Sequence, residues 1–142
     1  TVSFQFRQFT LKKWMKKIII VLVALCLSLL GIKLWATTAV QKQLASLTYE
    51  NVEMSLVRDG MYYGETKAGL VSVQVEVLVQ NHTIRGIEIV EHDNGLGRKA
   101  ESITLAMMQE NKWAVDAVSG ATLSSEAIKS AVSKALGAAQ ME

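Results

Sequence analysis

The stretch LVSVQVEVLVQNHTIRGIEIVEH, Leu70–His92, decides the fold of this chain. Valine occupies every second position of its first half, and this alternation predicts a half-buried strand over 70–80. Asn81-His82 is a turn signal, so we expect 83–92 to pair back as a second strand, with Gly86 at a bulge or a close backbone approach. A hairpin with one apolar face needs another layer to cover it.

Two predicted helices supply that layer. Residues 98–111 carry apolar side chains on one helical face, and 123–136 have a cleaner apolar stripe, with Gly137 as the expected stop. The segment 54–69, before the hairpin, is interpreted as two short strands separated by a turn. Strands followed by helices predict an α+β domain over 54–142, with a small antiparallel sheet covered by two helices.

A second apolar run, Ile18–Ala36, precedes this domain. It has nineteen residues with Lys33 as its only charge, and as a helix it would be about 28 Å long, close to a bilayer core. Residues 1–39 hold six Lys/Arg and no Asp or Glu, so the positive-inside rule predicts a basic cytoplasmic N-terminus over 1–17. We expect a single-pass cell-membrane protein with a flexible stem at 37–53 and its C-terminal domain outside the cytoplasm. A cleaved signal peptide is the alternative, and it also places the domain outside.

The composition of the remaining chain excludes several kinds of site. Residues 40–142 hold nine Lys/Arg against thirteen Asp/Glu, and an acidic domain is a poor candidate for binding nucleic acid. The same residues contain no cysteine, which excludes disulfides and thiolate metal sites. Glu91-His92-Asp93 is not expected to hold a metal, because neighbours on a strand point to opposite faces.

The segment DAVSGAT, Asp116–Thr122, directly precedes the last predicted helix. Thr122, Ser124 and Ser125 lie where the first helical N–H groups lack partners, and a hydroxyl there caps a helix and contributes about 1 kcal/mol. The same N–H groups and the helix dipole also favour an anion, above all a phosphate. Gly120 lets the backbone approach such a ligand or adopt a positive φ. From these residues alone a simple cap is the favoured interpretation, and an anion site is the alternative.

DAVSGAT also resembles the flavinylation sequence Asp-x-x-Ser-Gly-Ala-Thr of the FMN-binding domain family. That family includes the flavinylated domains of Rnf and Na+-translocating quinone reductase subunits and of exported flavoproteins. DGMYYGETKAG, Asp59–Gly69, resembles the family's opening Asp-Gly-x-Tyr-x-Gly, and the hairpin followed by Gly95–Gly97 resembles its hairpin and Gly-Leu-Gly loop. The resemblance covers about 59–136 and implies FMN as the cofactor.

The resemblance implies a role for each residue of the segment. Thr122 would carry FMN through a phosphoester that a flavin transferase forms from FAD. We expect the Ser119 side chain and the amides of Gly120 and Ala121 to donate hydrogen bonds to this phosphate at the helix N-terminus. Asp116 is too acidic to bind phosphate, so we expect it to serve in recognition by the transferase.

The flavin ring needs a flat and partly apolar slot. We expect Leu96 to pack on the isoalloxazine, while Gly95 and Gly97 let backbone amides reach its edge. The family usually has Thr-Pro before this Gly-Leu-Gly, and this chain lacks both residues. His92 is a further candidate for the cofactor site, with a surface histidine as the alternative. Three aromatic residues are also candidate ring neighbours, although core is their favoured interpretation: Tyr62, Tyr63 and Trp113.

We therefore expect an extracytoplasmic, membrane-anchored flavoprotein that transfers electrons without substrate turnover of its own. Its expected partners are a flavin transferase, and redox donor and acceptor proteins or a quinone-linked complex. Three alternatives remain open. The same domain could bind FMN without the covalent bond, it could be an accessory subunit of an Rnf-like electron-transfer complex, or it could be a flavin-free interaction domain in which SGAT only caps a helix.

Overall fold

The chain divides into two compact units, one ending at Ala39 and one beginning at Val40. The computed structural model describes residues 2–93 and 97–140, with side chains described from Trp14 onward except at 97 and 98.

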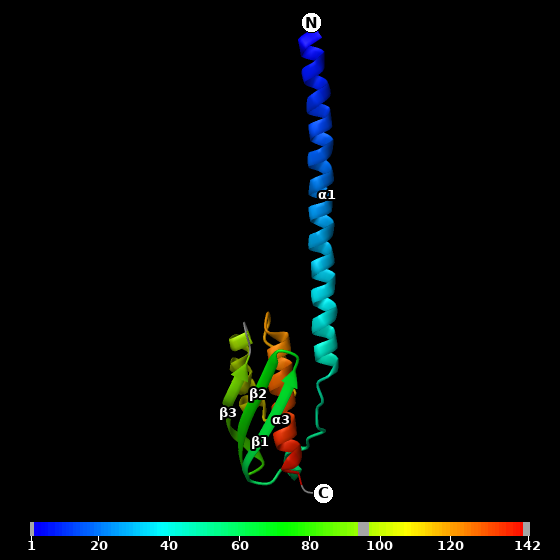
Figure 1. The fold of residues 1–142 in the computed structure, drawn as a ribbon. Helices are drawn as coiled ribbons and strands as arrows, with labels where there is room; N and C mark the ends of the chain where they lie inside the picture. The colour runs from blue at the N-terminus through cyan, green and yellow to red at the C-terminus, as the bar shows by residue number, and fades with distance from the viewer. Residues whose placement is uncertain (1, 94–96, 141–142) are drawn as a thin grey trace. The chain divides into compact units, whose positions relative to one another are not determined.

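The N-terminal unit consists of the first part of helix α1, which extends over Val2–Ala45 (Figure 1). From Trp14 to Ala45 the helix is long and apolar enough to cross a membrane, judged by length and composition. It continues without a break beyond Ala36, so the start of the expected stem is a continuation of the same helix.

The C-terminal unit contains an antiparallel sheet of three strands in the order β1-β2-β3. These are β1 (Gly60–Ala68), β2 (Val71–Gln80) and β3 (Thr83–Asp93) (Figure 1). Asn81 and His82 both have positive φ, 52° and 55°, as a two-residue hairpin turn of type I′ requires. The predicted hairpin and the α+β class are both confirmed.

The prediction of two short strands over 54–69 is wrong. A short 3-10 helix, η1 (Met54–Leu56), is followed by the single strand β1. Gly64 lies inside that strand, where a Cβ would come within 2.0 Å of the carbonyl oxygen of Ala131. Gly64 therefore permits the close approach of α3, while the turn signal Asp59-Gly60 lies at the start of β1.

The pairing of β2 with β3 is irregular at two places. One register shift lies between Leu78 and Val79, opposite Gly86, and confirms the bulge expected there. The other lies between Gln74 and Val75, and beyond it His92 pairs with Val73. Because directly opposed residues share a face, His92 lies on the same face of the sheet as the buried β2 valines.

Three helical segments follow the sheet. The expected helix over 98–111 is a 3-10 helix, η2 (Gly97–Ser102), that leads into α2 (Ile103–Glu110). The last helix, α3 (Thr122–Ala138), continues one residue past Gly137, so the stop predicted at that glycine is wrong. Helix α3 packs on β1 and β2, whereas α2 packs on β3.

The core lies between these helices and one face of the sheet. The fully buried side chains of β2 alternate with half-buried polar ones, as the sequence pattern predicted. The β2 residues that face the core are Val71, Val73, Val75, Val77 and Val79, and the α3 residues that meet them include Ile128, Ala131, Val132, Ala135 and Leu136.

Residues 47–53, here called the strap, lie along α3. The expectation of a flexible stem is therefore wrong for this part, because the side chains of α3 and Gln140 hold its backbone. The contacts are a hydrogen bond from the Ser130 hydroxyl to the Thr48 carbonyl, one from the Glu50 N–H to Ser133 Oγ at 3.3 Å, and one from the Glu53 N–H to Gln140 Oε1 at 2.8 Å.

Candidate functional site

The segment Asp116–Thr122 contains a tight turn that leads directly into α3. The N–H of Ala121 donates to the carbonyl of Val118 at 3.0 Å, and Gly120 has a φ of 79°. This left-handed conformation strains a residue with a Cβ, and no non-neighbouring described atom lies within 4 Å of where a Cβ on Gly120 would be. Gly120 is needed here for its backbone conformation. The Ala121 N–H, expected to bond to a phosphate, already has a protein acceptor.

Helix α3 begins without a side-chain cap. Its N-cap residue is Ala121, and the first intrahelical bond runs from the Ser125 N–H to the Ala121 carbonyl at 2.9 Å. The N–H groups of residues 122–124 therefore have no acceptor within the helix. The prediction that a hydroxyl caps this helix is wrong, because Ala121 takes the capping position and Thr122 becomes the first helical residue. This leaves a helix N-terminus that can stabilise an anion.

Ser125 holds the turn against the helix. Its fully buried hydroxyl accepts a hydrogen bond from the Val118 N–H at 3.0 Å. The start of the turn is thereby joined to the first turn of α3, which fixes the position of Thr122 between them. The sequence suggested only a helix-capping role for Ser125. Its role as acceptor for the Val118 N–H depends on how the turn folds back onto α3, which the local sequence does not show.

Most of the residues predicted for the attachment site are at the surface. Asp116, Ser119, Gly120 and Thr122 are exposed, whereas Ala121 is buried. The Thr122 hydroxyl is therefore accessible to an enzyme that modifies it.

Glu126 connects the start of α3 to the strap. Its Oε2 accepts a hydrogen bond from the Tyr49 phenol at 2.6 Å, and its Oε1 accepts one from the Lys129 ammonium at 2.9 Å. Burial, and after it the bond to Glu126, raises the pKa of Tyr49 well above its ordinary value. Tyr49 therefore keeps its proton and remains a donor to Glu126 at physiological pH.

Asp116 lies within the electrostatic range of Lys112. The carboxylate of Glu110, 2.7 Å from the Lys112 ammonium, is the main cause that raises the pKa of this lysine, and Asp116 adds a smaller contribution. The negative charge of Asp116 would oppose a phosphate nearby, so the position agrees with a role other than phosphate binding.

The aromatic candidates separate into three environments. Trp113 is half-buried and stacks on Tyr49, with ring centroids 5.2 Å apart and planes at 13°. Tyr62 packs against the core and donates a hydrogen bond from its hydroxyl to the Asp59 carbonyl at 3.3 Å. Tyr63 is 52% exposed on the sheet face away from α3, so the favoured interpretation as core is wrong for it.

His92 lies near the end of β3 with a buried side chain. The side chain is 3% exposed, and Nδ1 lies 3.1 Å from Oε1 of Glu101 in η2. Nε2 is buried and has no hydrogen-bond partner among the described residues. The alternative of a surface histidine is therefore wrong. Gly97 is the first residue of η2, whereas Gly95 and Leu96 lie outside the described residues.

The end of β3 and the start of α3 lie at the same end of the domain (Figure 1). The 3-10 helix η2, which carries Glu101, contacts α3. An uncapped helix start suits a phosphate, and a buried polar nitrogen without a partner requires a hydrogen-bonding group. The residues present at this end of the domain therefore suit the phosphate and the polar atoms of FMN.

Comparison with known families agrees with this geometry. The family described as FMN-binding domain matches residues 67–137, half of the chain. The chain belongs to that family. Comparisons with curated proteins and with solved structures gave no match. FMN is therefore the cofactor of this flavin-binding electron carrier. The matched region includes the residues predicted for the site except the candidate ring neighbours Tyr62 and Tyr63, which precede it.

Two residues that fasten the strap to α3 were not expected from the sequence: Ser130 of α3, and Tyr49 of the strap itself. Ser130 is fully buried, and its hydroxyl donates its one proton to the Thr48 carbonyl. The Ser130 oxygen, 2.9 Å from Oγ1 of Thr66, therefore accepts a hydrogen bond from the Thr66 hydroxyl. Tyr49 stacks and hydrogen-bonds as described above. Ser130 lies on the apolar face of the predicted helix, and a buried hydroxyl needs a hydrogen-bond partner. This position was the sequence signal that Ser130 contacts another part of the chain. Nothing in the local sequence marked Tyr49.

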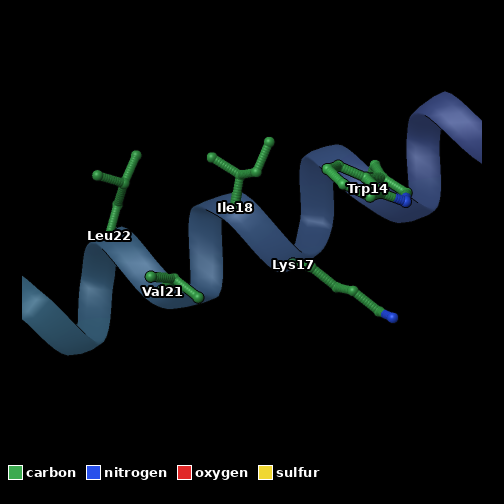
Figure 2. Close-up of a pocket in the computed structure, with 5 residues that line it drawn as sticks. All are labelled: Trp14, Lys17, Ile18, Val21 and Leu22. Atoms are coloured by element: carbon green, nitrogen blue, oxygen red, sulfur yellow. The ribbon is translucent and has the colours of Figure 1, made fainter.

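A hollow on α1 lies outside the FMN-binding domain. All of its lining residues come from one helix at helical spacing, so it is a groove between rows of side chains (Figure 2). Among the described side chains that line it, Lys17 is the only charged one, and we assign the hollow no ligand. The lining residues are Trp14, Lys17, Ile18, Val21 and Leu22.

Proposed function

We propose that this protein is an extracytoplasmic, membrane-anchored electron carrier whose FMN is joined to Thr122 by a phosphoester. The observation that carries the proposal is the position of Thr122, an exposed residue at the first position of an uncapped helix. Free N–H groups and the positive end of the helix dipole stabilise an anionic phosphodiester there. Bound FMN supplies one- or two-electron chemistry, and the protein supplies its position.

The attachment requires a flavin transferase that uses FAD. The Thr122 oxygen loses its proton and forms a bond to the flavin-side phosphorus, while the bond from that phosphorus to the bridging oxygen breaks and AMP leaves. The transferase supplies the base, so Thr122 needs no activating side chain in this chain. Ser119 and the free N–H groups at the start of α3 donate hydrogen bonds to the product.

Intact-mass measurement of the full chain, produced together with a flavin transferase, tests the covalent bond. We expect a gain equal to FMN minus one water, lost in Thr122→Ala and kept in the control Ser55→Ala, which removes an exposed hydroxyl outside the site. FMN that separates from the chain in acid, leaving an unmodified mass, would instead support the non-covalent alternative. A chain without any flavin would contradict the proposal.

Asp116 is proposed to serve in recognition by the transferase. Because its side chain is exposed and outside the core, Asp116→Ala should lower flavin loading without changing the melting temperature. Full loading of this variant would exclude the role.

The placement outside the cytoplasm follows from the basic residues that precede the apolar run. Cys26 is the single cysteine, and Leu70, 92% exposed in the β1–β2 turn, offers a site for a new one. In a chain with Cys26→Ser and Leu70→Cys, a membrane-impermeant maleimide should label whole cells. Labelling only after lysis would place the domain in the cytoplasm.

Redox donor and acceptor proteins, or a quinone-linked complex, are the proposed electron partners. FMN takes up one or two electrons, so the proposal needs one partner that supplies electrons and another that accepts them. The alternative of a flavin-free domain in which SGAT only caps a helix loses its support, since the N-cap residue is Ala121 and no side chain caps the helix.

A further inference from the structure

The buried imidazole of His92 is held by one identified contact. Its side chain is 3% exposed, and Nδ1 lies 3.1 Å from Oε1 of Glu101. An ionised carboxylate only accepts hydrogen bonds, so the bond requires the proton of His92 to be on Nδ1. A neutral ring then presents the lone pair of Nε2 as an acceptor.

Nε2 is the atom that this arrangement leaves without a partner. It is buried, and none of the described residues bonds to it. Buried polar atoms in folded proteins are almost always paired, so such an atom at a cofactor site indicates a contact that the cofactor completes. His92 is the second-last residue of β3 and Thr122 is the first residue of α3, and these two element ends lie at the same end of the domain (Figure 1).

We propose that Glu101 is a positioning residue that keeps the proton of His92 on Nδ1, so that Nε2 accepts a hydrogen bond from FMN. The inference rests on the proposed function, because it takes FMN to be bound at this end of the domain. FMN offers two kinds of donor to Nε2, the imide N–H of the ring and the ribityl hydroxyls. Glu101 acts only through the imidazole and touches no reacting atom.

The tautomer of His92 is measured without any flavin. The chain has two histidines, so nitrogen NMR of the full chain in detergent, with labelled histidine, resolves His92 beside His82 as an internal control. Glu101→Ala should move the His92 proton from Nδ1 to Nε2, whereas Glu101→Gln, which keeps an acceptor oxygen, should retain the wild-type pattern. Glu110→Ala is the matched control on α2 and should change neither histidine. An unchanged His92 tautomer in Glu101→Ala would overturn the positioning role.

Binding of free FMN by the chain, made without transferase, tests the contact itself. Glu101→Ala and His92→Ala should each weaken FMN binding about tenfold, the loss expected for one hydrogen bond. Glu101→Gln should lose less than about threefold, and Glu110→Ala should bind as the wild type does. Binding of lumiflavin, which lacks the ribityl chain, identifies the donor. If the donor is the ring N–H, His92→Ala should weaken lumiflavin binding as it weakens FMN binding. If the donor is a ribityl hydroxyl, His92→Ala should leave lumiflavin binding unchanged.

The two kinds of failure are distinguishable. A wild-type chain that binds no free FMN refutes the contact, while the intact-mass measurement still decides the proposed function and the NMR experiment still decides the positioning role. FMN bound equally well by the wild type, Glu101→Ala and His92→Ala refutes the contact and leaves the proposed function intact.

Discussion

Gly64→Ala is expected to destabilise the domain strongly, because this glycine lies where α3 contacts β1 most closely. A Cβ at this position would lie 2.0 Å from the carbonyl oxygen of Ala131 and 3.0 Å from the Cβ of Ala135. Real Cβ contacts are essentially never below 3.0 Å, so the helix backbone would have to retreat by about 1 Å. Neither obstacle is a flexible side chain that could turn away.

The expected loss of stability follows from overpacking. Inserting a methyl group into a close-packed core costs typically about 1–3 kcal/mol, and the rigid obstacles at Gly64 favour the upper end of this range. For a domain of about 100 residues, roughly 3 kcal/mol corresponds to a fall in Tm of more than about 10 °C. Gly86→Ala is the matched control on β3, because its new Cβ would meet only the Leu78 Cβ at 3.7 Å, an ordinary contact.

Thermal unfolding of the full chain in a mild detergent, followed by circular dichroism, measures both variants. Gly86→Ala should unfold within about 0.5 kcal/mol of the wild type, as substitutions outside such contacts usually do. If Gly64→Ala and Gly86→Ala have the same Tm, the close packing of α3 on β1 at Gly64 is refuted.

Three further predictions concern the contacts around the site. Ser125→Ala removes the acceptor of the Val118 N–H, so it should lower the free energy of unfolding by about 1–2 kcal/mol in urea titration; an unchanged midpoint would contradict this contact. Tyr49→Ala should lower the free energy of unfolding by about 0.5–1.5 kcal/mol, because it removes the stacking on Trp113, and it should shift the fluorescence emission of Trp113. Tyr49→Phe keeps the ring and should leave that emission unchanged. Identical emission spectra of the two variants would exclude the stack. The backbone N–H groups of the hairpin turn lower the pKa of Asp59. The ionised carboxylate therefore stabilises the folded domain fully at pH values above its ordinary pKa, about 3.9. This stabilisation is lost as the pH falls through the lowered pKa of the folded state. Asp59→Asn should therefore be less stable than the wild type at pH 7 and lose less stability in acid, and parallel acid titrations would contradict the prediction.

Local sequence patterns were enough to predict the elements whose cause is local. The alternation of valines in β2, the Asn81-His82 turn and the apolar stripe of α3 each follow from the spacing of residues in one segment. The membrane-length helix likewise needs only length and composition. The resemblance of DAVSGAT to the flavinylation sequence identified the family that the comparison then showed.

The tertiary structure decided the features that depend on residues far apart in the chain. The need for a glycine at position 64 comes from the Ala131 carbonyl on α3, and the burial of His92 comes with its contact to Glu101 in η2. The strap was expected to be flexible because its few apolar residues gave no sign of the serines on α3 that bind its backbone. A local pattern records which side chains an element must bury, whereas the group that each of them meets depends on the packing of the whole domain. For this reason the sequence by itself determined the sheet, the helices and the family, and only the folded domain showed how Thr122 and His92 are held at one end of it.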